Sequence, residues 1–278
     1  MLLADRHVLL TGATGTIGRR LTEQLVARGA RVTVVARSAG PLDDLARRLG
    51  VRPLPADLTQ ASALEDVIAR AEAGSGPVDA IVHNAAVETV GRLDELEPGD
   101  VERTVALNLT APLALTRLVL PGMIARGHGH VVLVSSLAGV ASFPGLAVYG
   151  ATKAGLTHAA AGLRLELRRT GVGTTVAELG PVESAMMDRA RRHSAAGGSF
   201  ARVYRLRALR DLDPGVVAAA VLDAVEAGRP VVRLPRRAAP LAAVAGLPRQ
   251  LVRGVLAGMP AQGSAPARSV DPAPGPAA

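Results

Sequence analysis

The sequence predicts an α/β fold of the doubly wound (Rossmann) type, with a seven-stranded parallel sheet and helices on both faces. Short apolar runs alternate along the chain with longer segments of helical periodicity. Strands that are apolar throughout belong in a sheet covered on both faces, and strands that alternate with helices are joined by right-handed crossovers. The first apolar run also ends in a glycine-rich turn that leads directly into a helix.

The predicted strands are rich in valine, leucine and threonine. Residues 31–36 illustrate this, since three of the six are valine and one is threonine, residue types that suit a buried pleated sheet. We expect strands at 7–11, 31–36, 51–55, 78–83, 131–135, 172–179 and 231–234.

Between these strands, apolar residues recur every three or four positions, which predicts amphipathic helices. Leu42, Leu45 and Leu49 show this spacing. We expect helices at 17–28, 42–49, 61–73, 98–126, 148–170 and 214–227. Pro112 and Pro121 should break the region 98–126, because proline has no N–H and its ring clashes with the preceding turn.

The chain is expected to form one domain over residues 1–258, without internal repeats. Within it, residues 185–211 contain paired glycines and are expected to be a mobile lid over the substrate. Residues 235–258 form a basic, proline-interrupted extension, and residues 259–278, rich in Pro, Ala, Gly and Ser, are expected to be a disordered tail.

Composition excludes several classes of protein. The 278 residues include no cysteine, so disulfides and thiolate sites are ruled out, which fits a reducing, cytoplasmic location. Neither a signal peptide nor an uncharged membrane-spanning stretch is expected. The net charge of +8 comes from scattered arginines, and with two Phe, two Tyr and no Trp there is little for bases to stack on. We therefore expect no nucleic-acid partner, and no metal ion.

The turn after the first strand is the clearest binding signal. It contains Gly12, Gly15 and Gly18 and opens a helix. Glycines allow the tight turn and bring backbone N–H groups close to a pyrophosphate at the helix N-terminus. An NAD site would place an acid at the end of the second strand, where this chain has Ala36 followed by Arg37. This favours NADP, with NAD still possible. Asp57 either accepts a hydrogen bond from adenine or caps the next helix.

The clearest chemical signal is a lone lysine. Of 32 basic residues only Lys153 is lysine, and it follows Tyr149 by four positions. This spacing puts the phenol and the ammonium on one helix face. A cation beside a phenol lowers the pKa of tyrosine towards neutrality, which would make Tyr149 a general acid or base.

Taken in order, these motifs resemble the short-chain dehydrogenases/reductases over residues 7–256. The resemblance also rests on Asn84-Ala85-Ala86 after the fourth strand, Asn108 in a helix, Ser136 thirteen residues before Tyr149, and Gly180 to Ser184. Thr16 stands where the single-domain branch has glycine, and the glycine spacing matches the larger epimerases and dehydratases. The Ser–Tyr spacing and the small region after Gly180 favour the single-domain oxidoreductases.

The resemblance implies a role for each site residue. Tyr149 would exchange the proton, Lys153 would lower its pKa, Ser136 would hold the substrate oxygen, and Asn108 would link Lys153 to solvent through a water. Cofactor contacts are implied for Thr11, Gly12, Thr14, Gly15, Thr16, Ile17, Gly18, Arg37, Asp57, Leu58, Asn84, Ala85, Ala86, Tyr149, Lys153, Gly180 and Val182.

The expected function is hydride transfer between NADP(H), or NAD(H), and a ketone or secondary alcohol, which the apolar lid residues Met186, Met187, Phe200 and Tyr204 suggest is hydrophobic. A sugar-nucleotide epimerase or dehydratase and a non-catalytic NADP-binding sensor are the alternatives. The family suggests a homodimer or homotetramer built on helices 111–126 and 148–170. Residues 235–258 either pack on the protein or dock on an anionic membrane, and Pro240 and Pro248 favour packing.

Overall fold

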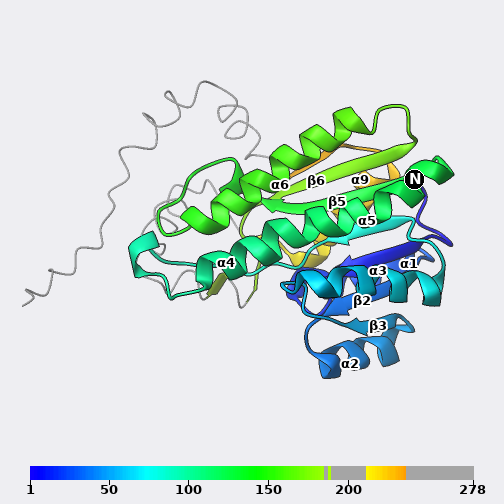
Figure 1. The fold of residues 1–278 in the computed structure, drawn as a ribbon, viewed down its shortest axis with the longest axis horizontal. Coiled ribbons are helices and arrows are strands. Elements are labelled where there is room, and N and C mark those ends of the chain that lie inside the picture. Colours follow the sequence, from blue (N-terminus) through cyan, green and yellow to red (C-terminus); the bar gives the residue numbers. More distant parts are fainter. Residues whose placement is uncertain (185–186, 189–210, 236–278) are drawn as a thin grey trace, which may run out of the picture.

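A computed structural model describes residues 1–184, 187–188 and 211–235 of the chain. In Figure 1 these residues form one parallel sheet with helices packed against both of its faces. The predicted extension beyond residue 235, the tail 259–278 and nearly all of the predicted lid 185–211 lie outside the described residues.

The predicted seven-stranded parallel sheet is confirmed. Its strand order is β3-β2-β1-β4-β5-β6-β7, so the direction of winding reverses between β1 and β4. In a sheet of this kind, ligands bind beyond the carboxyl ends of the strands at the point of reversal. The strands are β1 His7–Thr11, β2 Arg31–Ala36, β3 Arg52–Pro55, β4 Ala80–His83, β5 Gly129–Ser136, β6 Val172–Leu179 and β7 Val231–Leu234.

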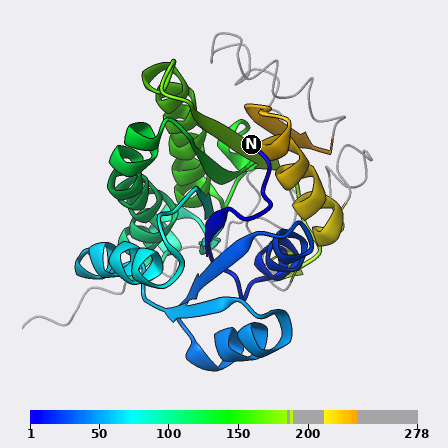
Figure 2. The same cartoon turned by 90° about the vertical axis from the view of Figure 1, so that its right-hand side faces the viewer.

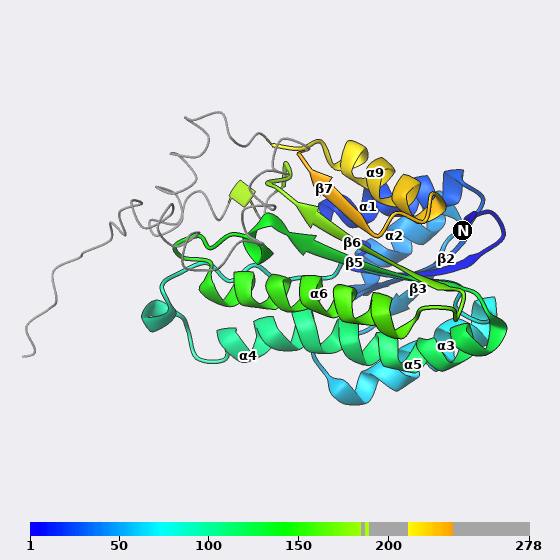
Figure 3. The same cartoon turned by 90° about the horizontal axis from the view of Figure 1, so that it is seen from above.

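The helices form two layers, which Figure 3 shows on either side of the sheet seen edge-on and Figure 2 shows from one end. One layer consists of α1 Thr16–Ala27, α2 Ala39–Leu49 and α9 Pro214–Glu226, and the opposite layer contains α3 Ala61–Ser75, α5 Ala111–Arg126 and α6 Ala147–Glu166. A short helix, α4 Asp100–Val105, leads into α5, and 3-10 turns lie at Leu93–Glu95 and Leu137–Gly139.

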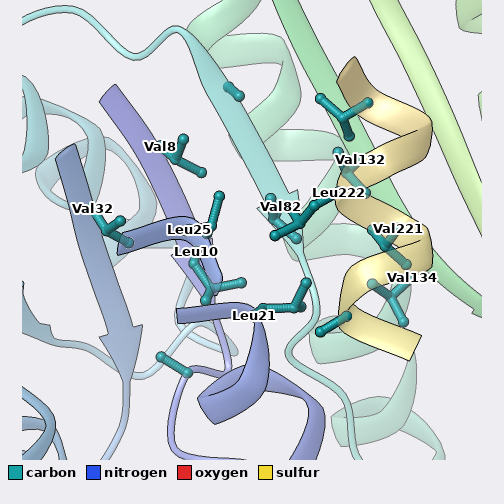
Figure 4. Close-up of a cluster of buried hydrophobic side chains, with 14 of the residues drawn as sticks. Val8, Leu10, Leu21, Leu25, Val32, Val82, Val132, Val134, Val221 and Leu222 are labelled. Atoms are coloured by element: carbon teal, nitrogen blue, oxygen red, sulfur yellow. The ribbon is translucent and has the colours of Figure 1, made fainter. Parts of the chain in front are cut away.

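The two faces of the sheet bury separate apolar clusters because successive strand residues point in opposite directions. Val8 and Leu10 of β1 pack with α1 and α9, whereas Leu9 between them packs with the other layer. Val132 and Val134 of β5 join the first cluster in the same way, as Figure 4 shows. Covered on both faces, the strands are free to be apolar throughout, and their carboxyl ends remain for binding.

The long helical region differs from the prediction at one of its two prolines. A π-helical turn, Ala106–Thr110, precedes Pro112, so the regular α-helix is interrupted there as expected. The expected break at Pro121 is wrong, because α5 continues through it to Arg126. Packing of α5 on the sheet through Leu115, Val119 and Met123 keeps the helix together on both sides of the proline.

The segment Asp100–Arg126 is long and apolar enough, by length and composition alone, to cross a membrane. In this structure 39% of that apolar window is buried, and its buried residues pack against the sheet and neighbouring helices. The other boundaries differ from the prediction by a few residues: for example, α2 begins at Ala39 rather than 42, and the helix expected to reach residue 170 ends at Glu166.

Three histidines are buried on the strands, each next to a neutral partner. His83 Nε2 lies 2.8 Å from Thr116 Oγ1, His130 Nε2 lies 2.8 Å from Thr175 Oγ1, and His7 Nε2 lies 2.9 Å from Thr33 Oγ1. Burial lowers the pKa of His83 to about 3 and of His130 to about 4, and it also lowers that of His7. All three are therefore neutral in the folded protein at pH 7.

These histidines should make the fold sensitive to acid. Below pH 6.5 the unfolded chain protonates these histidines while His83 and His130 stay neutral in the folded state, so the free energy of unfolding decreases as the pH is lowered. Each such group contributes a slope of about 1.4 kcal/mol per pH unit. We expect His83→Gln to remove one such slope between about pH 6 and 4, measured by urea unfolding at several pH values.

The exposed His158 provides the matched control for this experiment, as His158→Gln. The two variants should differ in how their unfolding free energy changes with pH. Parallel curves for wild type and His83→Gln would show that His83 is not the group whose neutrality the fold protects.

Candidate active site

A large cavity opens at the carboxyl edge of the sheet, where the winding reverses between β1 and β4. Its volume is about 1000 Å³, and its lining runs from the glycine turn after β1 to the start of α6. A cavity of this size is large enough for a cofactor together with a small substrate. It is the point at which the fold alone predicts ligand binding.

The glycine turn has the geometry that phosphate binding requires. Gly12 has a φ of +69°, and a Cβ there would lie 2.6 Å from the Cα of Ala85. A Cβ on Gly18 would lie 2.1 Å from the carbonyl oxygen of Gly12, so helix and turn could not pack so closely with larger residues. Gly15 caps α1, whose first turn carries no acid, and the helix N-terminus therefore favours an anion in the cavity.

The hydroxyl of Thr11 ties the ends of β1 and β4 together behind this turn. It accepts hydrogen bonds from the backbone N–H of Asn84 and of Ala85, each at 3.1 Å. In return, Asn84 Nδ2 donates to the carbonyls of Thr11 and Gly12, at 3.2 and 3.0 Å. Asn84 and Ala85 line the cavity, while Thr11 supports them from behind the wall.

Arginines surround the far mouth of the cavity, at the end of β2. Arg37 is exposed and lines the cavity there, as the sequence predicted. Sequence reasoning did not single out Arg20 and Arg48, which also line it and both approach Glu23, at 2.8 and 3.7 Å. Their positions in the predicted helices were the only sequence signal for these two residues, and the many other arginines of the chain obscure that signal.

Asp57 does not lie in the cavity wall. Its carboxylate accepts from the backbone N–H of Thr59 at 3.0 Å and from the Thr59 hydroxyl at 2.8 Å, which keeps the pKa of Asp57 low. The alternative reading as a helix cap is wrong, because Gln60 is the N-cap of α3. Leu58 and Thr59 line the cavity instead.

Tyr149, Lys153 and Ser136 meet on one wall of the cavity, as predicted. Lys153 Nζ lies 5.6 Å from the centre of the Tyr149 ring, and the phenol is hydrogen-bonded to Ser136 at the end of β5. The ammonium donates to the carbonyl oxygen of Val134 at 2.9 Å, and the lysine is only 3% exposed. The i, i+4 spacing in α6 thus brings these groups together.

The pKa values run against the sequence-based expectation. Burial raises the pKa of Tyr149 well above its ordinary value, and Glu88 adds to this, while the Ser136 hydrogen bond opposes it. The expected lowering by Lys153 is therefore wrong for this structure. Burial lowers the pKa of Lys153 itself to about 8, against the influence of Glu88. Tyr149 therefore holds its proton.

Asn108 lies in the π-helical turn, fully buried. Its Oδ1 accepts from the backbone N–H of Val87, and its Nδ2 donates to the Val87 carbonyl, both at 2.8 Å. Nδ2 also lies 3.3 Å from Thr152 Oγ1, next to Lys153. The side chain therefore clamps the loop after β4 onto the π-helical turn and α6, behind the cavity wall.

The segment after β6 closes the cavity on its remaining side. Gly180 donates its N–H to the Leu234 carbonyl at 2.7 Å, and Val182 pairs with Leu212 in a short bridge. Both line the cavity, and Met187 is the one residue of the expected apolar lid set that the structure describes there.

Most of the predicted residues gather around this cavity. Those that line it are Gly12, Thr14, Gly15, Thr16, Ile17, Arg37, Leu58, Asn84, Ala85, Ala86, Ser136, Tyr149, Lys153, Gly180 and Val182. Those that do not are Thr11, Gly18, Asp57 and Asn108. Sequence reasoning missed Glu88, Leu107, Phe143 and Leu146, which line the end near Tyr149. Within the described ranges, no three His, Asp or Glu residues lie close enough to hold a metal ion.

Comparisons with known proteins agree with this fold. The family model described as short chain dehydrogenase matches residues 6–195. The ketoacyl reductase HetN of Nostoc is 33% identical over 198 residues, which are 69% of each chain. A short-chain dehydrogenase from Streptomyces avermitilis has a TM-score of 0.77 at 28% identity, over 92% of this chain and 96% of its own.

A further solved structure shows the same fold at low identity. It is a short-chain dehydrogenase/reductase from Burkholderia phymatum in complex with NAD, with a TM-score of 0.78 and 19% identity over 92% of this chain and 96% of its own.

The Asn108 clamp can be tested by its contribution to stability. Replacing Asn108 with Leu keeps the volume but leaves the N–H and carbonyl of Val87 without partners. An unsatisfied buried group costs about 1–3 kcal/mol, so we expect a loss of this size or more in urea unfolding. Thr152→Val is the comparison variant, because it removes the Thr152 hydroxyl's contacts to Asn108 and to the Tyr149 carbonyl but leaves both Val87 groups bonded to Asn108. Equal losses in the two variants would contradict the clamp.

Proposed function

Because the chain belongs to the short-chain dehydrogenase/reductase family of oxidoreductases, we propose that it transfers a hydride between a nicotinamide cofactor and a ketone or secondary alcohol. The observation that carries this proposal is the meeting of Tyr149, Ser136 and Lys153 on the wall of a cavity that also contains the glycine turn. The cofactor, when bound, supplies or accepts the hydride.

The residues of this chain would handle the proton and the substrate oxygen. Tyr149 donates its proton to the carbonyl oxygen, and Ser136, which already hydrogen-bonds the phenol, holds that oxygen as negative charge develops on it. The raised pKa of Tyr149 suits the proton-donating direction, since the phenol is protonated before the reaction.

Lys153 would stabilise the charge that forms on Tyr149. Its buried ammonium lies beside the phenol and stabilises the phenolate that forms when the proton leaves. Asn108 would supply the route from Lys153 to solvent through a water, and its contact to Thr152, the residue before Lys153 in α6, supports this role.

The glycine turn and the N-terminus of α1 would hold the pyrophosphate, and Leu58 and Ala85 would line the adenine and nicotinamide regions. We propose NADP as the preferred cofactor. Arg37 at the mouth has Arg20 and Arg48 nearby, and the end of β2 carries no carboxylate to hold a ribose hydroxyl. A guanidinium fork matches a 2′-phosphate.

We also propose a homo-oligomer in the cytoplasm. Val101, Val105, Leu113 and Ile124 are exposed on α4 and α5, and Leu165 is 61% exposed on α6. Of these, α5 and α6 are the helices on which a subunit contact was expected, and α4 adjoins them. The lack of cysteine and the core packing of α5 support a soluble setting.

The proposed reaction is tested with a panel of apolar ketones and secondary alcohols, followed at the nicotinamide absorbance with NADPH, NADH and their oxidised forms. We expect net cofactor turnover in wild type and a loss of about 100-fold or more in Tyr149→Phe, the size attributed to general acid–base catalysis. NADPH binding, measured by fluorescence, should persist in that variant.

The outcomes separate the alternatives. Product formed without net change in the cofactor would favour an epimerase-like enzyme over this proposal. Binding without any turnover would favour a sensor. Turnover in Tyr149→Phe equal to wild type would remove Tyr149 from the chemistry.

The cofactor preference has its own test. Arg37→Ala should raise KM for NADPH by about 10-fold or more, the loss expected for one charge-assisted contact to phosphate, and should leave KM for NADH nearly unchanged. Arg47→Ala is the matched control, since Arg47 is exposed on α2, is paired with Asp44 and does not line the cavity. Equal effects on the two cofactors would contradict the proposed 2′-phosphate contact.

A further inference from the structure

Arg19 is a cavity-lining arginine to which the glycine motif assigns no role. It follows Gly18 directly, as the fourth residue of α1, and its side chain is exposed. Its Nε donates a hydrogen bond back to the carbonyl oxygen of Thr14 at 2.9 Å. The guanidinium is therefore held beside the glycine turn instead of extending away from the protein.

The bond to Thr14 leaves the phosphate-binding part of the guanidinium unused. It engages Nε, which carries one of the five N–H donors, and not the two terminal nitrogens. The terminal nitrogens form the planar fork that matches a phosphate. A side chain already fixed by one hydrogen bond also loses less rotational freedom when it binds a ligand. Arg19 therefore has the geometry of a preorganised phosphate ligand.

The contacts of Arg19 differ from those of two other arginines that line the same mouth. Arg20 and Arg48 both approach the carboxylate of Glu23, at 2.8 and 3.7 Å, which offsets part of their charge. The partner of Arg19 is instead a neutral carbonyl, and a bond to it does not reduce the positive charge. Arg19 is therefore better suited than its neighbours to bind an anion.

The backbone of the glycine turn places this guanidinium at the end of β2. The N–H groups of Gly12 and Ala13 donate to the carbonyl of Val35, at 2.8 and 3.3 Å, so the turn lies against β2. Thr14 is the next residue of the turn, and Arg37 follows the end of β2. In this type of fold the adenosine ribose lies at the end of the second strand. The guanidinium held at Thr14 and that of Arg37 therefore border the ribose region from two different elements.

We propose that Arg19 is a second ligand of the 2′-phosphate of NADP, and that it binds this group together with Arg37. The three outer oxygens of a phosphate can accept from two guanidinium groups at once. This inference rests on the cofactor preference proposed above, and it assigns part of that preference to α1.

Binding of four nucleotides to the full-length protein tests the proposal without turnover. They form two pairs, NADPH with NADH and adenosine 2′,5′-bisphosphate with 5′-AMP, and the members of each pair differ in the 2′-phosphate. Kd is measured by calorimetry. In wild type we expect the 2′-phosphorylated member of each pair to bind about 100-fold more tightly, because two charge-assisted contacts are added.

Variants assign this preference to individual arginines. Arg19→Ala should weaken both 2′-phosphorylated ligands about 10-fold and leave NADH and 5′-AMP nearly unchanged. Arg19→Lys keeps the charge but has neither Nε nor the planar fork, so it should restore only part of the loss. Replacing Arg19 and Arg37 together by Ala should bring both ratios close to one.

Arg70→Ala is the matched control. Arg70 is exposed on α3, is paired with Asp66 and does not line the cavity, so the same change of charge there should keep the wild-type ratios. Thermal melting of each variant without ligand shows that it is folded.

Each outcome decides the proposal. A loss in Arg19→Ala that is confined to the 2′-phosphorylated ligands, and absent from Arg70→Ala, supports it. Equal losses for NADPH and NADH would assign Arg19 to the pyrophosphate and overturn it, as would ratios that Arg19→Ala leaves unchanged. Wild-type ratios near one would contradict the NADP preference itself and the inference with it, whereas wild-type ratios that survive Arg19→Ala contradict the inference alone.

Discussion

The site depends on a single hydroxyl group at the point where the sheet changes its winding direction. Thr11 ends β1 and accepts hydrogen bonds from the first two residues after β4. These two strands are neighbours only because the strand order reverses between them. The glycine turn and the Asn84 loop are therefore held as two walls of one crevice. The loop after β4 is fixed at a second point further along, where the backbone of Val87 is hydrogen-bonded to Asn108.

The sequence predicted the strand set and most of the site, because both depend on local patterns. Continuous apolar runs report a strand buried on both faces, and the Tyr149–Lys153 spacing reports a shared helix face. Properties that depend on tertiary packing could not be predicted from such local patterns. The break expected at Pro121 is absent because contacts elsewhere on α5 hold the helix. The raised pKa of Tyr149 depends on burial, which no short motif contains.

Glu88 is a cavity-lining residue that local sequence patterns likewise did not indicate. In the sequence it is an acid in a polar loop, and such residues are usually solvated. Only the fold shows that its two neighbours are anchored and that its side chain faces the cavity. Lys153, in contrast, was indicated by the sequence, because the one lysine among so many arginines suggests a site that arginine does not suit. The structure supplies the reason: a 3% exposed site with one carbonyl acceptor suits a slender ammonium better than a planar guanidinium with five donors.

The anchoring of the loop after β4 also separates two kinds of change. Both supports act through residues other than Glu88: the backbone of Val87 and the hydroxyl of Thr89. The identity of the side chain at position 88 can therefore vary while the loop keeps its path. A substitution there changes the lining of the cavity in a single step, without first requiring mutations that restore the fold.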